Sequence, residues 1–407
     1  MLFYKPSFMD IVPFSKANKY MNNFEFKNPT KIIFGEGEIK KLADNIPAGA
    51  KVLLAYGGGS IKKNGIYEQV IEATKGFKIT EFSGIEPNPH FETLMKAVKI
   101  IREKQIDFIL AVGGGSVIDG VKFLSAAAYY DGDEWELVEH MKAKKQEKVV
   151  PFGTVLTLPA TGSEMNSGAV ITKAATQQKR TFGGPQYFPV FSVLDPTVVA
   201  SLPQRQIANG LVDAFTHTME QYLTYDHGAY LQDRIAEGIL QTIIEIAPKI
   251  MDNPSDKHLA GEFMWSATMA LNGLLRLGVP TDWATHMIAH ELTALHGIDH
   301  ARTLAIIAPN LYRKLKADKL QKLVQYGKRV WDIKEGSDEE IADKAIEQTV
   351  SFFESLGIDT KLSLYTKEYQ DTAQIIHDRF ADRKWLGLGE RQKVGPQLAK
   401  EIVELSY

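Results

Sequence analysis

Four of the chain's ten histidines lie within fifteen residues, at His286, His290, His296 and His300. His286 and His290 are four residues apart, a spacing that places two side chains on one face of a helix. Gly297 interrupts that helix and could turn the chain so that His300 returns to the same face. Because imidazole is a good ligand for zinc or iron, this density predicts a transition-metal site. The alternative is a group of core histidines with ordinary hydrogen bonds.

A carboxylate and a further histidine supply the rest of a ligand set. Residues 207–223 have the pattern of an amphipathic helix, and Asp213 and His217 lie one turn apart in it. Such a pair can hold a metal ion from a single rigid surface. Alone the pair is weak evidence, because on a surface helix both side chains are usually solvated. Together with His286 and His300 it predicts an Asp-His-His-His site.

The elements that must position these residues follow two patterns. Between residues 23 and 195, apolar strands alternate with helices, which favours a mostly parallel sheet covered on both faces. The expected strands are 51–56, 79–82, 108–112, 151–158 and 190–194, and the expected helices are 67–75, 91–104 and 119–130. From residue 206 the periodicity is helical, with breaks expected at Pro254, Gly278–Pro280, Gly297, Pro309, Gly336 and Gly357. We therefore predict an α/β domain over 21–200 and an all-α domain over 201–407.

Composition narrows the classes of function. The formal net charge is −3, so no basic excess favours a nucleic-acid partner. The absence of cysteine excludes disulfides, thiolate ligands and iron–sulfur clusters, and it fits a reducing cytoplasm. No apolar run reaches the length of a transmembrane helix, so no membrane partner is expected. Residues 1–20 lack a signal-peptide core and a cleavage site, and we expect a poorly ordered extension there.

A glycine-rich turn, Gly113-Gly114-Gly115-Ser116, joins the strand at 108–112 to a helix. Glycine lets the backbone approach a ligand closely, and the first turn of the helix directs free N–H groups at an anion. A dinucleotide pyrophosphate fits this arrangement. The turn is not G-x-G-x-x-G, so an ordinary Rossmann fingerprint is absent. A plain tight turn between strand and helix is the alternative.

The same four residues occur earlier, at 57–60, again directly after a strand. In dinucleotide-binding folds an acidic residue near the adenine ribose binds the 2′-hydroxyl of NAD and repels the 2′-phosphate of NADP. No Asp or Glu lies between residues 56 and 67, whereas Ser60, Lys62 and Lys63 could receive a phosphate. If this turn meets the ribose, NADP(H) is preferred over NAD(H). The alternative is that both lysines are simply solvated.

These motifs resemble those of the iron-containing alcohol dehydrogenases, specifically the branch of NADPH-dependent butanol dehydrogenases and broad-range aldehyde reductases. The resemblance runs from residue 21 to the C-terminus and is carried by GGGSVIDG, LPATGSE, ANGLVDAFTHTMEQY and GVPTDWATHMIAHELTALHGIDHA. It implies a dinucleotide-binding α/β domain followed by an all-α metal-binding domain, as in the dehydroquinate synthase-like fold. One departure is His300-Ala301, where many members have His-Gly, which bears on the subfamily rather than on the ligand.

The resemblance also implies site residues. It assigns the metal to Asp213, His217, His286 and His300, and it places His290 near nicotinamide and substrate. The implied NADP(H) contacts are Gly58, Gly59, Ser60, Asn88, Gly114, Gly115, Ser116, Asp119, Thr157, Leu158, Thr161 and Lys179. The expected metal is one divalent ion, zinc or iron, since a nitrogen and oxygen donor set accepts both. A homodimer is also implied.

The activity implied is reversible reduction of aldehydes to primary alcohols. NADPH would supply the hydride, the metal would act as a Lewis acid, and His290 would relay the proton or serve structure alone. We expect a cleft between the domains, with a pocket for medium-length or aromatic aldehydes formed by Trp265, Trp283, Ser163 and Asn166. The alternatives are an NAD-dependent polyol dehydrogenase, a dehydroquinate synthase-like lyase, and a dinucleotide-binding protein without catalysis.

Overall fold

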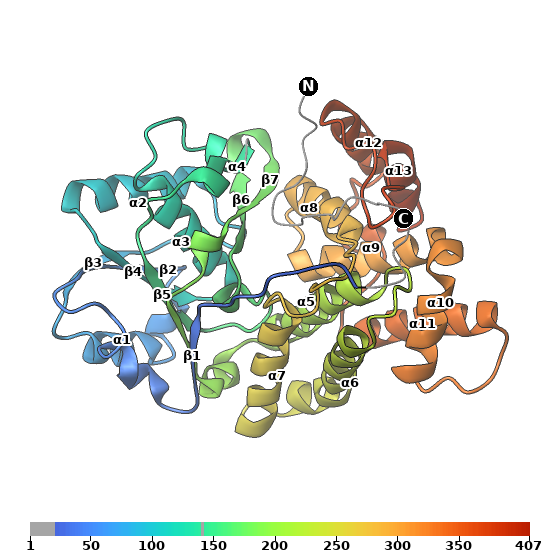
Figure 1. The fold of residues 1–407 in the computed structure, drawn as a ribbon, viewed down its shortest axis with the longest axis horizontal. Coiled ribbons are helices and arrows are strands. Elements are labelled where there is room, and N and C mark those ends of the chain that lie inside the picture. Colours follow the sequence, from blue (N-terminus) through green and yellow to red (C-terminus); the bar gives the residue numbers. More distant parts are fainter. Residues whose placement is uncertain (1–20, 140–141) are drawn as a thin grey trace.

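The computed structural model describes residues 21–139 and 142–407, arranged as an α/β part and a helical part (Figure 1). The extension predicted over 1–20 lies outside the described residues. None of the helices in the described part of the chain is both long enough and apolar enough to span a membrane.

The α/β part is built on a six-stranded, fully parallel sheet with the strand order β1-β8-β5-β4-β2-β3. Its strands are β1 (Lys31–Phe34), β2 (Lys51–Tyr56), β3 (Lys78–Phe82), β4 (Phe108–Gly113), β5 (Phe152–Leu156) and β8 (Phe191–Leu194). Every residue of β4 and β5 is buried, as expected for strands covered on both faces. The mostly parallel sheet predicted from the apolar runs is confirmed.

The connecting helices are α1 (Ile66–Ala73), α2 (Phe91–Lys104) and α3 (Gly115–Ala127), with a short α4 (Glu136–Glu139) after them. Crossovers between parallel strands are right-handed. The crossover from β2 to the edge strand β3 therefore puts α1 on one face of the sheet. The crossovers from β3 to β4 and from β4 to β5 run in the opposite direction and put α2 and α3 on the other face. The carboxyl ends of all the strands therefore meet at one edge. Both glycine-rich turns lie at that edge.

Two features of the α/β part were not predicted. β1 is a four-residue edge strand in which a single residue, Ile33, is buried. An antiparallel hairpin, β6 (Gly168–Lys173) and β7 (Gln178–Gly183), stands outside the main sheet. It brings Lys179 and Thr181 to the side of the molecule where the helical part begins.

The helical part begins at α5 (Gln204–Tyr222). It continues through α6 (Tyr230–Asp252), α7 (Lys257–Ala270), α8 (Ala284–His296), α9 (His300–Lys314), α10 (Lys316–Arg329), α11 (Asp338–Ser355), α12 (Thr372–Asp382) and α13 (Pro396–Glu404). The break predicted at Gly297 is present, with φ of 66° between α8 and α9. The break predicted at Pro309 was wrong. This proline lies inside α9, where residues 301–312 are all buried, so packing outweighs the hydrogen bond that proline removes.

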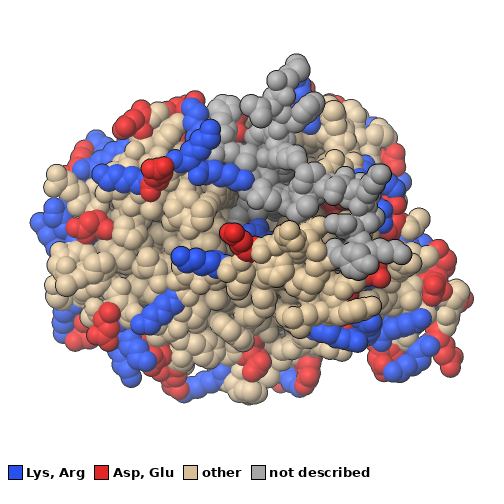
Figure 2. Space-filling view, in the orientation of Figure 1, with Lys and Arg blue, Asp and Glu red and all other residues tan. Residues whose placement is uncertain are grey.

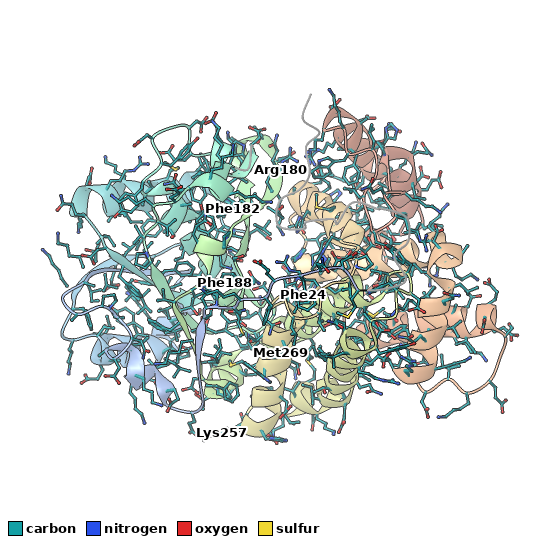
Figure 3. All side chains as sticks on the ribbon, viewed as in Figure 1. Phe24, Arg180, Phe182, Phe188, Lys257 and Met269 are labelled. Carbon is teal, nitrogen blue, oxygen red and sulfur yellow. The ribbon has the colours of Figure 1, made fainter. Side chains whose placement is uncertain are left out.

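Two segments join the two parts. The 3₁₀ turn η7 (Pro196–Ser201) connects β8 to α5, and the predicted boundary near residue 200 falls within it and stays a prediction. The other is the extended chain before β1, where the Asn22 N–H donates to the Gly278 carbonyl oxygen at 2.9 Å. Figure 3 labels Phe24 on this segment, between the two parts. The Asn28 side chain donates to the carbonyl oxygens of Met165 and Asn272.

Replacing Gly210 by alanine tests the contact between α5 and the α/β part. An added Cβ would lie 2.3 Å from the Pro159 carbonyl oxygen and 2.7 Å from Cζ of Phe263. We expect Gly210→Ala to lower the free energy of unfolding by about 1–3 kcal/mol in urea denaturation. The control is Gly238→Ala at an exposed position of α6, where a Cβ meets no atom within 4 Å; helix propensity there predicts a gain of up to about 1 kcal/mol. Unchanged stability of Gly210→Ala would contradict the tight contact.

Candidate active site

A cavity of about 350 Å³ lies between the two parts. One wall is the carboxyl edge of the sheet and the β6–β7 hairpin, and the other comes from α5, α8 and the start of α9. This is the cleft that the sequence predicted. On the face seen in Figure 2, Lys and Arg lie near Asp and Glu mainly toward the rim, and the centre that is not covered consists largely of other residues.

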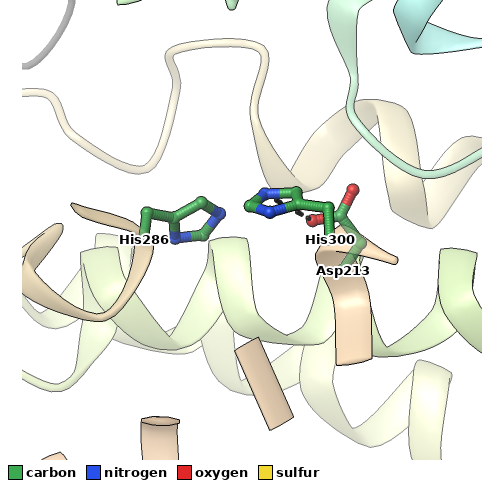
Figure 4. A group of neighbouring side chains, drawn as sticks. All are labelled: Asp213, His286 and His300. Atoms are coloured by element: carbon green, nitrogen blue, oxygen red, sulfur yellow. Dashed lines mark ion pairs between the residues drawn. The ribbon is translucent and has the colours of Figure 1, made fainter. Parts of the chain in front are cut away.

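Three of the four predicted metal ligands form one compact group. Asp213, His286 and His300 each offer a ligand atom, and these atoms lie within 4.8 Å of one another (Figure 4). His300 Nε2 is 4.0 Å from Asp213 Oδ1. His217 lies outside this group but beside it, because its ring stacks on that of His286 at 4.7 Å and its Nδ1 is 3.6 Å from Asp213 Oδ1.

Each of the four side chains has a buried polar atom with no hydrogen-bond partner. These atoms are Asp213 Oδ1, His217 Nδ1, His286 Nε2 and His300 Nδ1. Most buried polar atoms in proteins are paired, so four orphaned ligand atoms in one place need a common explanation. A cation held by Asp213, His286 and His300, with His217 beside them, would account for unpaired atoms at this place, and nitrogen with carboxylate oxygen suits zinc or iron.

Burial also prepares the imidazoles for ligation. It lowers the pKa of His217 and of His286 to about 4, against the opposing attraction of Asp213. Burial holds the pKa of His290 and of His300 well below the usual value as well, and the nearby Lys179 ammonium adds to the shift. All four rings are therefore neutral near pH 7, which is the form that binds a metal.

The other two histidines of residues 286–300, His290 and His296, differ in whether they reach the cavity. His290 lines the cavity, and its ring lies 5.0 Å from that of His300. His296 does not reach the cavity; its Nε2 is 2.8 Å from Thr372 Oγ1. Trp283 also lines the cavity, at 5.4 Å from the His286 ring, and its φ of 68° is unusual for a bulky residue.

The second glycine-rich turn is shaped for close backbone approach. A Cβ on Gly115 would lie 2.3 Å from Thr161 Oγ1, and one on Gly114 would lie 3.0 Å from Leu158 Cβ. The turn opens directly into α3, and the residues from Gly114 to Val117 line the cavity. This cradle fits a pyrophosphate.

Polar groups beside this turn form a buried network. The Asp119 carboxylate accepts from Ser163 Oγ at 2.6 Å and from the Val170 N–H at 2.8 Å. Lys122, which the sequence analysis missed, donates to Ser163 Oγ, to Asn166 Oδ1 and to the Gly168 carbonyl oxygen. Its spacing of three from Asp119 on one helix was the available signal. Burial lowers the pKa of Lys179, on the facing hairpin, to about 8.

The cavity brings most of the predicted cofactor residues together but not all. Its lining includes Gly58, Asn88, Gly114, Gly115, Ser116, Asp119, Leu158, Thr161 and Lys179. Gly59, Ser60 and Thr157 are not part of the lining. The prediction that Trp265 lines the pocket was wrong, because this side chain is 40% exposed and packs edge-on against Phe34. Trp283, Ser163 and Asn166 do line it.

An acidic residue that the sequence reasoning overlooked stands near the first glycine-rich turn. Glu81 is on β3, which pairs with β2 in parallel. Glu81 therefore lies close to the end of β2 although the two are distant in sequence. Tyr56 and Tyr67 donate to its two carboxylate oxygens at 2.8 and 2.6 Å. Lys62, which was expected to be free for a phosphate, lies 3.6 Å from Glu81 and over the Tyr67 ring.

Comparison with known proteins agrees with this architecture. The model of the family described as "Iron-containing alcohol dehydrogenase" matches residues 29–196, and the model of the C-terminal part of the same family matches 207–387. The chain belongs to the iron-containing alcohol dehydrogenase family. The resemblance inferred from the motifs is thereby confirmed, and the chain is an oxidoreductase of the alcohol dehydrogenase and aldehyde reductase class.

Relatives of this alcohol dehydrogenase include the NADPH-dependent aldehyde reductase YqhD of Escherichia coli, 50% identical over 94% of this chain and 99% of the relative. The NADH-dependent butanol dehydrogenase A of Clostridium acetobutylicum is 44% identical over 84% and 89%. Among solved structures, E. coli YqhD superposes with a TM-score of 0.93, covering 95% of this chain and all of that one. The Thermotoga maritima NADH-dependent butanol dehydrogenase A gives 0.89 at 34% identity, with 95% and 99% covered.

The lowered histidine pKa values predict how the metal-free enzyme responds to acid. The pKa of His217 is about 4 in the folded protein and 6.5 ordinarily, so between these values the unfolded chain binds more protons. The free energy of unfolding should therefore fall as the pH drops from 6.5 to about 4, by up to about 1.4 kcal/mol per pH unit for this residue.

Urea denaturation across this pH range measures the effect. His217→Asn removes the titrating ring, so the slope against pH should be shallower than in the unsubstituted protein. Identical slopes would show that burial of His217 does not shift its pKa.

Proposed function

We propose that this chain is a metal-dependent alcohol dehydrogenase that uses NADP(H) to interconvert aldehydes and primary alcohols. The observation that carries the proposal is the set of four candidate ligand side chains, each with an unpartnered buried polar atom, on the cavity wall opposite the glycine-rich turn. A metal and a dinucleotide held there would share one cavity of about 350 Å³. The relatives named as an aldehyde reductase and a butanol dehydrogenase support the substrate class.

Asp213, His217, His286 and His300 are the residues that would hold the metal. Bound zinc or iron supplies a Lewis acid for the carbonyl oxygen of the substrate. The side chains themselves contribute rigidity, because all four come from α5, α8 and α9 and three of them are at most 5% exposed. Because the candidate ligands include no thiolate, their donor atoms do not select between zinc and iron. Metal supply and site geometry would decide which ion is bound.

The cofactor residues are those of the sheet edge. The turn at 113–116 and the start of α3 would bind the pyrophosphate, while Asn88, Asp119 and Lys179 would face the nicotinamide half. NADP(H) supplies the hydride, and the chain's share is position and electrostatics. Asn88 is itself fixed, because its N–H donates to Ser116 Oγ at 3.1 Å.

Aldehyde reduction consumes one proton, and His290 is the residue we assign to its transfer. His290 lines the cavity, is 3% exposed and is not one of the four candidate metal ligands. A neutral imidazole can take a proton from water at one nitrogen and give one to the product oxygen from the other. Trp283, Leu271 and Ala160 give the same pocket an apolar side, which suits an unbranched or aromatic aldehyde.

Metal removal and reloading test the proposal. The chain is stripped of metal, reloaded separately with zinc or iron, and supplied with butanal and either NADPH or NADH. We expect metal-dependent oxidation that is much faster with NADPH. His286→Asn should lose this activity, whereas the control His296→Asn, whose ring lies outside the cavity, should keep it. No turnover with any metal or cofactor would leave a dinucleotide-binding protein as the better account.

The preference for NADP(H) is tested at Gly58. This glycine lines the cavity, and an added Cβ would meet no atom within 4 Å. A carboxylate there would repel a 2′-phosphate, so Gly58→Asp should raise KM for NADPH roughly tenfold or more, since a close charge pair costs about 1–4 kcal/mol. Gly58→Asn is the matched uncharged control. Equal KM values for NADPH in the two variants would show that no 2′-phosphate lies beside residue 58 and would remove this support for NADP(H).

We further propose that two copies associate and that the enzyme works in the cytoplasm. The exposed side chains of Phe24, Phe26, Phe34 and Trp265, each 40–51% exposed, support self-association. The lack of cysteine fits a reducing compartment. Sedimentation at the mass of a single chain would contradict the dimer.

A further inference from the structure

One buried carboxylate joins the two helices that hold most of the candidate metal ligands. Glu220 lies on α5, two turns after Asp213 and one turn after His217. Its side chain crosses to α8, where Oε1 accepts from the Thr285 N–H at 2.7 Å and Oε2 contacts His286 Nδ1. The side chain is 1% exposed, so both oxygens are committed to α8.

Both contacts matter for the orientation of His286. The Thr285 N–H is one of the unpaired donors at the start of α8, so a carboxylate there fixes the end of the helix. The contact at Nδ1 holds the other side of the imidazole ring and leaves Nε2 as the nitrogen directed at Asp213 and His300. For Nε2 to bind a metal, Nδ1 must carry the hydrogen and donate it, which a carboxylate acceptor favours.

A second carboxylate anchors the same helix end. Asp282 accepts from the Ala284 N–H at 2.9 Å, and its own N–H donates to the Glu220 carbonyl oxygen at 2.8 Å. Lys319 on α10 compensates this charge, donating to Asp282 at 2.6 Å and to Glu390 at 2.8 Å. Among the described residues, no lysine pairs with Glu220, whose side chain binds the Thr285 N–H and His286 Nδ1.

We infer that Glu220 is a positioning residue that presets His286 against Asp213 and so raises the affinity of the site for its metal. The inference rests on the proposed metal site and goes beyond it, because it assigns a role to a residue outside the ligand set. A purely structural carboxylate would stabilise the fold without changing metal affinity. The two roles are therefore separable by measurement.

The experiment measures the apparent Kd for Zn²⁺ by competition with a chromophoric chelator, on the metal-stripped full chain. Glu220→Ala should raise this Kd by about 10–100-fold, the range known for loss of a carboxylate behind a metal-bound histidine. Glu220→Gln should give a smaller rise, because the amide oxygen still accepts one hydrogen bond. The absorption spectra of the Co²⁺-loaded variants should differ from that of the Co²⁺-loaded unsubstituted chain, because the ligand geometry changes. The Kd for NADPH, followed by fluorescence, should stay within twofold of the unsubstituted value.

The matched control is Glu237→Ala. Glu237 is a similarly buried carboxylate that binds Tyr222, Arg234 and Arg329 and does not line the cavity. It should lower thermal stability and leave the Zn²⁺ Kd unchanged. A folded Glu220→Ala with a Kd within twofold of the unsubstituted chain overturns the inference, and if that variant does not fold, an unchanged Kd in Glu220→Gln does so. An unsubstituted chain that binds no Zn²⁺ would instead refute the metal site itself, and this inference with it.

Discussion

Asp213, His217, His286 and His300, on α5, α8 and α9, each have a buried polar atom without a hydrogen bond, and the desolvation of these atoms constrains the helical part. Each unsatisfied polar atom costs about 1–3 kcal/mol, a large share of the 5–15 kcal/mol by which a typical domain is stable. The cost is tolerable only if the helices cannot relax and a cation is available. Contacts such as Glu220 with the start of α8 provide the first condition.

The α/β part meets a different requirement at the same cavity. A dinucleotide needs the backbone itself to come close, so side chains must be small at the turn over residues 113–116, where the loop after β5 also packs against it. At Gly115 even a methyl group would overlap Thr161. The two parts therefore offer complementary surfaces, one of bare backbone and one of polar side chains, and reaction chemistry is confined to where they meet.

Much of this arrangement could be predicted from the sequence because it depends on local spacing. The i, i+4 pair Asp213 and His217, the αL break at Gly297 and the strand before each glycine-rich turn are all short-range patterns. Contacts set by tertiary pairing could not be predicted. Glu81 reaches the first turn only through the register of β2 with β3, and Glu220 reaches His286 only through packing of two helices. The prediction for Trp265 failed for the same reason, since a side chain of suitable type lies outside the cavity lining.

The left-handed backbone of Trp283 has a consequence for changing this cavity. A tryptophan at φ of 68° is strained, and glycine is the residue that adopts this conformation without cost. Most substitutions that enlarge a pocket lose stability with the packing they remove. Here the removal of a large ring would coincide with relief of the backbone, so evolution or design could widen the cavity at this position with a smaller loss of stability than elsewhere in its wall.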